Sequence, residues 1–148
     1  MDLSLEAAMD AAPADVLAEV ADLSGYPDWH GMVHKVVPDG DGWLVDLEAK
    51  LGPFKQSTRV RLVRAEAEEG EGADSGRVRF VRAELDGKEH SRWELEGIVD
   101  PLTGEGPCTL TFRVASDKSS PLIGMAEPIL RAEVERSAVR LRQRLAQA

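Results

Sequence analysis

The side chains best suited to chemistry include a cluster of rings in one short stretch. The sequence SGYPDWHG, residues 24–31, places Tyr26, Trp29 and His30 close together in a chain that is only 5% aromatic. Amphipathic rings of this kind line the entrance of a ligand cavity, or they fill a gap in a hydrophobic core. Both interpretations stay open for Tyr26 and Trp29.

Polar side chains also interrupt the apolar rows of predicted strands. Gln56 and Thr58 break one such row, and Arg82 and Ser91 break two neighbouring rows. A ligand cavity needs this pattern, because apolar walls supply affinity while a few donors orient the ligand. The competing interpretation is that these groups are simply solvated.

Arg82 raises a separate question, because a buried guanidinium must be paired. The neighbouring carboxylates are Glu84 and Glu89. Arg82 therefore pairs with one of them, binds an anionic ligand group, or lies in solvent.

The other chemical signals are weak. His30 and His34 have the spacing of two metal ligands on a helix, but Gly31 lies between them where a strand pattern begins. Cys108 falls on an inward strand row, where a thiol is usually inert. No nucleophile-elbow sequence is present. We predict no metal and no cofactor, and we assign no catalytic residue.

Composition limits the function further. The 148 residues suit a single domain, residues 1–148, and their net charge of -9 disfavours nucleic-acid binding. No apolar run reaches the roughly 20 residues that span a bilayer, and the N-terminus carries acids where a signal peptide carries bases. With Cys108 as the only cysteine, we expect a cytoplasmic protein without integral membrane insertion.

The expected elements begin with a strand near residues 3–10 and a helix that starts at Pro13. YPDWHG has room for at most one further turn. Residues 43–51 then alternate, and Gly52-Pro53 predicts a tight hairpin to residues 54–63. Its register pairs Leu51 with Phe54 and places Trp43, Val45 and Leu47 opposite Leu62, Val60 and Thr58.

A second hairpin is predicted from Asp86-Gly87, a strong two-residue turn signal. Its register pairs Phe80 with Trp93 and Val78 with Leu95, so that Arg82 faces Ser91. A further strand points Cys108, Leu110, Phe112 and Val114 inward.

The last segment predicts a long helix that Pro128 either kinks or begins. Its apolar stripe is Leu122, Ala126, Ile129, Leu130, Val134, Ala138, Leu141 and Leu145. The arginines near its end suit the helix dipole.

The stretch AAPADVLAEVADLSGYPDWH resembles the N-terminal signature of helix-grip proteins of the START and Bet v 1-like (SRPBCC) superfamily, in the branch of polyketide cyclases and dehydrases. The matching positions are Ala12-Pro13, Val16, Asp22, Tyr26-Pro27 and Trp29. The resemblance implies an α+β helix-grip fold. Its curved antiparallel sheet of about six to seven strands wraps around the C-terminal helix, with two short helices after the first strand.

The resemblance also implies an apolar cavity between sheet and helix, for a small hydrophobic molecule such as a lipid, an isoprenoid or quinone, or a polyketide. The residues expected to line it or orient the ligand are Tyr26, Trp29, Trp43, Gln56, Thr58, Phe80, Arg82, Ser91, Trp93, Phe112, Met125 and Ile129. An aromatase or cyclase using the same cavity is the alternative, with Arg82 and Tyr26 among its proton-transfer candidates. A second alternative is a protein-interaction module with a collapsed cavity, and a protein partner or homodimer stays open.

Overall fold

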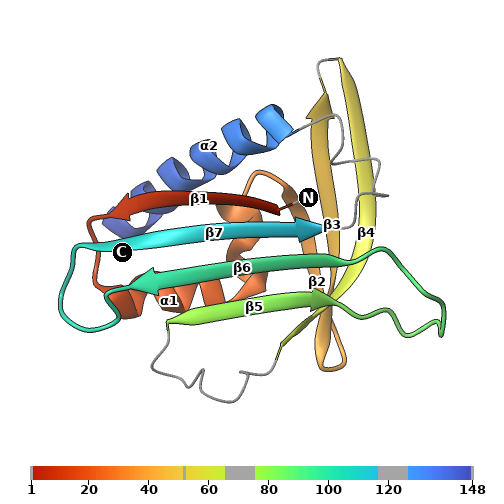
Figure 1. Cartoon of the computed structure of the whole chain (residues 1–148), viewed down its shortest axis with the longest axis horizontal. Helices are drawn as coiled ribbons and strands as arrows, with labels where there is room; N and C mark the ends of the chain where they lie inside the picture. The colour runs from red at the N-terminus through yellow and green to blue at the C-terminus, as the bar shows by residue number, and fades with distance from the viewer. Residues whose placement is uncertain (1, 52, 66–75, 117–126, 148) are drawn as a thin grey trace.

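The computed structural model describes residues 2–51, 53–65, 76–116 and 127–147. These residues form one antiparallel sheet of seven strands, in the order β1-β7-β6-β5-β4-β3-β2, with helices on it (Figure 1). The strands are β1 (Asp2–Met9), β2 (Val33–Asp39), β3 (Gly42–Leu51), β4 (Phe54–Arg64), β5 (Arg77–Arg82), β6 (Trp93–Asp100) and β7 (Cys108–Ser116). The helices are α1 (Pro13–Ala21), the 3-10 helix η1 (Leu23–Asp28) and α2 (Glu127–Ala146). The predicted α+β architecture is confirmed.

The sheet is strongly curved. In Figure 1, β3 and β4 run steeply across the direction of β5, β6 and β7, while α1 and η1 lie behind the latter strands. α1 contacts β5 and β6, η1 contacts β2, and α2 contacts β1 and β3. The helices therefore cover the inner face of the sheet, where the core lies.

The connection from α1 into η1 is built from local signals. Pro13 occupies the start of α1, where its missing N–H costs nothing. Asp22 then caps η1, because its Oδ1 accepts a hydrogen bond of 3.0 Å from the backbone N–H of Ser24. η1 begins at Leu23, earlier than the further turn predicted within YPDWHG, and its six residues make about two 3-10 turns. It delivers Trp29 and His30 to the inner face of the sheet.

The first predicted hairpin is confirmed in register. Leu51 pairs with Phe54, and Trp43, Val45 and Leu47 pair with Leu62, Val60 and Thr58. Most of this inner row is buried, including Val45, Leu47, Val60 and Leu62. A two-residue connection leaves the register no freedom, which explains the agreement.

The second predicted hairpin is wrong in register by two residues. Phe80 pairs with Leu95 rather than Trp93, and Val78 pairs with Gly97 rather than Leu95. β5 ends at Arg82 and β6 begins at Trp93, so the connection has ten residues, 83–92, instead of two. Because the shift is even, the buried faces of both strands stay as predicted.

β2 differs from the sequence prediction, whereas β7 agrees with it. β2 was not predicted as a strand of its own, since its residues do not alternate cleanly and its pairing shifts between Val33 and Lys35. β7 follows its prediction: Cys108, Leu110, Phe112 and Val114 are buried.

α2 packs an apolar stripe against the sheet. Val134, Ala138 and Leu141 are buried, and Leu145 packs against the core. These four agree with the predicted stripe, while Leu122 and Ala126 and the side chains of Ile129 and Leu130 lie outside the described parts. Pro128 lies in the first turn of the described helix. None of the described helices is long and apolar enough to cross a membrane.

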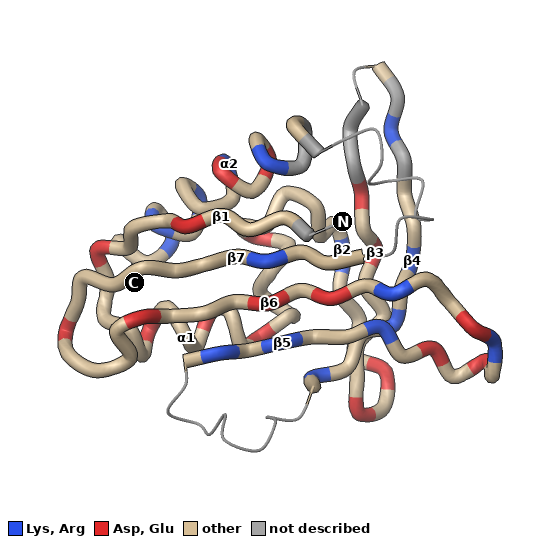
Figure 2. Tube along the Cα trace, viewed as in Figure 1, with Lys and Arg blue, Asp and Glu red and all other residues tan. Residues whose placement is uncertain are grey.

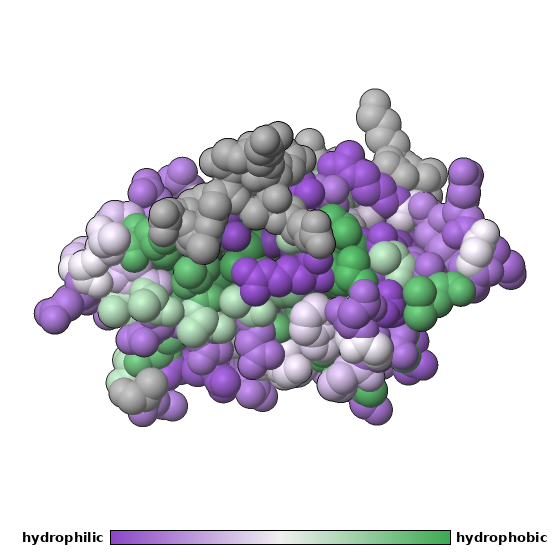
Figure 3. Space-filling view, turned by 90° about the horizontal axis from the view of Figure 1, so that it is seen from below, coloured by the Kyte–Doolittle hydropathy of each residue, from purple (hydrophilic) through white to green (hydrophobic). Residues whose placement is uncertain are grey.

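The described surface is mainly polar and mixed in charge. Figure 2 shows Lys and Arg interspersed with Asp and Glu along β5 to β7 and in the 83–92 connection. Viewed from below, apolar residues gather in patches toward the middle of this face, with hydrophilic residues between and around them (Figure 3). Most of the large aromatic side chains are buried instead.

Packing of α2 predicts one stability result. Leu141 is fully buried in the core, so Leu141→Ala should lower the free energy of unfolding by about 2–5 kcal/mol. Val139 lies on the same helix but is 44% exposed, and Val139→Ala should change it by less than about 0.5 kcal/mol. Denaturant unfolding of the two variants measures the difference; equal losses would contradict this packing.

Candidate functional site

Six rings converge on the inner face of the sheet. Tyr26 lies 4.6 Å from Trp29 and 6.2 Å from Phe80, as ring centroids, and Trp29 lies 5.8 Å from Phe112. His30 stacks on Tyr26 at 5.7 Å, and Trp43 meets Phe80 edge-on at 5.6 Å. We call these six side chains the ring cluster. It unites η1 and the segment after it with β3, β5 and β7.

Tyr26 has its polar end engaged inside the protein. Its hydroxyl donates a 2.7 Å hydrogen bond to the carbonyl oxygen of Val20, at the end of α1. Burial, reinforced by the negative charge of Asp22, raises the pKa of Tyr26 far above its usual value. Tyr26 therefore ties η1 to α1 and keeps its proton.

His30 is the one ionisable member of the ring cluster besides Tyr26. Burial lowers the pKa of His30 to about 4, with Glu133 opposing and Arg140 reinforcing this shift. The backbone N–H of Met32 donates to His30 Nδ1 at 3.3 Å. The imidazole is thus neutral at pH 7, and Nε2 carries its hydrogen.

The segment that contains Trp29 and His30 is hydrogen-bonded to α2. We call residues 29–32 the 29–32 loop. The backbone N–H of Gly31 donates to Ser137 Oγ at 2.9 Å, and Arg140 donates to the carbonyl oxygen of Trp29 at 3.1 Å. Arg140 is itself bound to Glu133 at 3.0 Å. We call Glu133, Ser137 and Arg140 the α2 clamp, because these residues of α2 hold the 29–32 loop against the helix.

The Glu133 side chain closely approaches the backbone at Gly31. A Cβ added at Gly31 would lie 1.5 Å from Glu133 Oε1 and 2.4 Å from its Cδ. Partial burial would raise the pKa of Glu133, but hydrogen bonds from Arg136 and Arg140 hold it below its usual value. Glu133 thus stays ionised above the glycine, and any side chain at position 31 must displace it.

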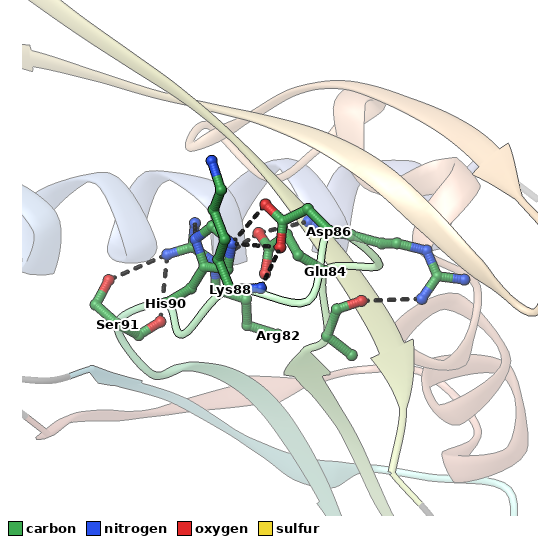
Figure 4. A network of polar contacts seen from close by, with 8 residues as sticks. Arg82, Glu84, Asp86, Lys88, His90 and Ser91 are labelled. Atoms are coloured by element: carbon green, nitrogen blue, oxygen red, sulfur yellow. Dashed lines mark hydrogen bonds and ion pairs between the residues drawn. The ribbon is translucent and has the colours of Figure 1, made fainter.

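Arg82 belongs to a different network, at the 83–92 connection (Figure 4). Its Nε donates to Glu84 Oε1 at 2.6 Å, and its Nη1 donates to Ser91 Oγ at 3.0 Å. Its Nη2 lies 3.3 Å from His90 Nδ1, and His90 Nε2 lies 2.9 Å from an Asp86 carboxylate oxygen. Arg82 therefore pairs with Glu84, as one of the three expectations held, and its side chain is only 15% exposed.

This network explains the wrong register of the second hairpin. Asp86 accepts from the backbone N–H of Lys88 at 3.0 Å and from His90, so the turn at Gly87 forms. Arg82 binds Ser91 by side chain rather than across a strand ladder. Hydrogen bonds between side chains at the 83–92 connection therefore take the place of the backbone pairs that a two-residue turn would have formed there.

Most of the predicted site residues that the structure describes fall into two groups. Tyr26, Trp29, Trp43, Phe80 and Phe112 meet in the ring cluster. Arg82, Ser91 and Trp93 line a surface hollow of about 500 Å³ beside the 83–92 connection. Thr58 lies on β4, where it pairs with Leu47 of β3, and belongs to neither group. Met125 and the side chains of Gln56 and Ile129 lie outside the described residues.

Three participants in the site were missed from the sequence. His30 was noted among the rings of residues 24–31 but was not predicted as a binding residue, and its metal spacing to His34 was discounted; His34 lies exposed and 3.5 Å from Glu48. Glu133 and Ser137 received no role of their own in the predicted C-terminal helix. The arginines near its end were assigned to the helix dipole. In the structure Arg140 is ion-paired with Glu133, and Arg144 is ion-paired with Glu19 and Asp28. The available signal was the position of Ser137 within the apolar stripe, at helical spacing to Val134 and Leu141.

Two further features complete the described surface. Within the described ranges, no group of three His, Cys, Asp or Glu side chains is arranged to hold a metal. A second hollow, of about 250 Å³, lies between the end of β1 and the end of α2, lined by Met9, Ala11, Arg142 and Leu145 among others.

Comparison with known proteins agrees with this architecture. The family described as polyketide cyclase/dehydrase and lipid transport matches residues 2–146. Among curated proteins, none matches the sequence. A START superfamily protein from Mycobacterium smegmatis has a TM-score of 0.69 at 17% identity, covering 99% of this chain and 97% of the other.

Two more solved structures are similar. A conserved protein from Geobacillus kaustophilus has a TM-score of 0.72 at 12% identity, covering 99% of this chain and 96% of its own. The Zhui aromatase/cyclase from a Streptomyces species has a TM-score of 0.53 at 17% identity, covering 97% and 89%. At these identities the likeness shows the fold alone, and it confirms the predicted helix-grip fold.

The α2 clamp predicts the effect of a side chain at position 31. Gly31→Ala should lower the free energy of unfolding by about 1–3 kcal/mol, because the new methyl group displaces Glu133. In a Glu133→Ala background the same change should cost less than half as much. Chemical denaturation of the four proteins completes this cycle. An unchanged cost without Glu133 would contradict the contact.

His30 predicts a pH dependence of stability. The native state keeps His30 neutral down to about pH 4, whereas the unfolded chain protonates it near 6.5. The free energy of unfolding should therefore fall between about pH 6.5 and 4, by up to about 3 kcal/mol. Urea titrations of wild type and His30→Phe measure this. Glu133 and the other carboxylates titrate in both proteins, so identical pH profiles would contradict a buried neutral His30.

Proposed function

The chain belongs to the polyketide cyclase/dehydrase and lipid transport family, and from this membership we propose that it binds a small hydrophobic molecule between the inner face of the sheet and α2. The ligand classes are a lipid, an isoprenoid or quinone, or a polyketide-like molecule. The observation that supports this most is the ring cluster, which gathers most of the aromatic side chains on one inner face. Aromatic walls of this kind suit flat or branched apolar ligands.

Binding is favoured over catalysis by the state of Tyr26 and Arg82, two of the expected proton-transfer residues. The Tyr26 hydroxyl is engaged with Val20 and keeps its proton. The Arg82 guanidinium is engaged with Glu84 and Ser91. General acid–base chemistry needs a group within reach of the reacting atoms and a suitable pKa, and neither residue meets both conditions.

An aromatase or cyclase remains the second candidate because of His30. A neutral imidazole that carries its hydrogen on Nε2 is able to polarise a ketone oxygen. Two similar structures are described as aromatase/cyclases, Zhui and the di-domain StfQ. On this hypothesis the chain turns over a synthetic poly-β-ketone and His30→Phe abolishes the turnover. Absence of product with the folded wild-type protein contradicts it.

The compartment and the partners are part of the proposal. A single buried thiol, Cys108, suits a reducing environment such as the cytoplasm. The mixed and net negative charge favours a small molecule over nucleic acid as the ligand.

A filled-cavity variant tests the binding proposal. Phe80→Trp adds volume within the ring cluster, between Tyr26 and Trp43. It should weaken binding of the neutral apolar dye Nile red at least fivefold and change the free energy of unfolding by less than about 1 kcal/mol. Leu85→Trp, which adds the same ring at a 77% exposed position, should leave dye binding unchanged.

The opposite result is equally clear. If the interior is solid, Phe80→Trp costs about 1–3 kcal/mol of stability and wild type takes up no dye. That outcome contradicts the binding proposal and favours the protein-interaction module with a collapsed cavity.

A further inference from the structure

All four backbone N–H groups of the 29–32 loop donate hydrogen bonds within the protein. The N–H groups of Trp29 and His30 donate to the carbonyl oxygen of Tyr26 at 3.1 and 2.7 Å. The N–H groups of Gly31 and Met32 donate to Ser137 Oγ and His30 Nδ1. The carbonyl oxygens of Trp29, His30 and Met32 also accept hydrogen bonds. Buried polar groups are expected to be paired in this way.

Trp29 Nε1 is an exception within this loop. The Trp29 side chain is fully enclosed, with only 1% of the residue exposed, and its indole N–H has no hydrogen-bond partner among the described residues. An indole nitrogen is a donor only, and leaving it unpaired in a dry interior is costly. The backbone N–H groups of this loop are all paired, so the unpaired indole N–H stands out as a donor that is available to a ligand.

His30 supplies a second donor next to it. Since Nδ1 accepts from Met32, the hydrogen of the neutral ring lies on Nε2. None of the hydrogen bonds formed by described residues uses this Nε2. The two rings lie 5.5 Å apart, and each contacts Phe112, at 5.8 Å for Trp29 and 6.4 Å for His30. Two uncommitted N–H donors therefore lie on neighbouring rings beside one apolar ring.

The charges around the pair select the kind of acceptor. The Glu133 carboxylate lies directly over Gly31 and disfavours an anionic group nearby. Arg136 and Arg140 are already bound to Glu133. A carboxylate or phosphate would thus lose its water without gaining a free cation. An uncharged oxygen with lone pairs meets neither difficulty.

We propose that Trp29 Nε1–H and His30 Nε2–H form a donor pair that binds an uncharged carbonyl oxygen of the ligand, in a ketone, ester or quinone. The inference rests on the proposed function, because it assigns the polar end of the same hydrophobic ligand. It makes Trp29 a specificity-determining residue rather than packing alone. It also predicts that a hydrocarbon of equal size binds without this hydrogen bond.

A matched pair of probes tests the donor pair on the full chain. 2-Acetylnaphthalene and 2-isopropenylnaphthalene have nearly the same shape, and they differ in one group, C=O against C=CH₂. Calorimetry measures the affinity of each for wild type and for Trp29→Phe. The ratio of ketone to alkene affinity should fall about tenfold in Trp29→Phe, because the donor is lost. Trp43→Phe removes a ring of the same cluster and should change both affinities together, leaving the ratio as in wild type.

A second measurement observes the donor directly in wild type, and uses a variant only to assign its signal. In a ¹H–¹⁵N spectrum of wild type, the three indole N–H groups give separate signals, and Trp29→Phe identifies one. The ketone should move the Trp29 signal downfield, and the alkene should not. If both probes bind, the ratio is unchanged and the signal does not move, the donor pair is wrong while the binding proposal stands. If neither probe binds, the binding proposal fails together with it.

Discussion

The close approach of α2 to the 29–32 loop is the contact on which the rest of the site depends. Gly31 has no side chain, and the Glu133 carboxylate occupies the space directly above its backbone. Ser137 and Arg140 then bind the loop by its N–H and carbonyl groups. With the loop fixed, Trp29 and His30 point their rings at Phe112 rather than at solvent. A polar contact at the helix surface thus positions the apolar interior beneath it.

The fold was largely predictable wherever a short turn or a strict alternation defined it. The Gly52-Pro53 connection fixes the β3–β4 register, and the alternation of β7 fixes its buried face. The β5–β6 register was not predictable from Asp86-Gly87. Arg82, Glu84, Asp86 and His90 bind one another by side chain, and this replaces the last ladder pairs. Local turn propensity cannot weigh such a network, because it acts between residues that the turn rule does not consider.

The site was predictable in part, and the limits are physical. The ring-rich stretch at Tyr26 and Trp29 could be recognised as unusual, and both rings do join the inner cluster. The role of His30 could not be inferred, since its neutral state follows from its burial, which the sequence does not reveal. The α2 clamp joins residues more than 100 positions apart. No local pattern reveals such a pair, although a buried serine in an apolar stripe is a hint.

Mass spectrometry of the freshly purified protein tests the central claim most directly. Spectra under native conditions, followed by denaturation and solvent extraction, show whether the chain carries a small molecule. The account predicts a reproducible mass increment that is released on unfolding and belongs to an apolar compound with an uncharged carbonyl group. A protein of bare mass that also takes up no added apolar compound would contradict it, and the ring cluster would then be packing only.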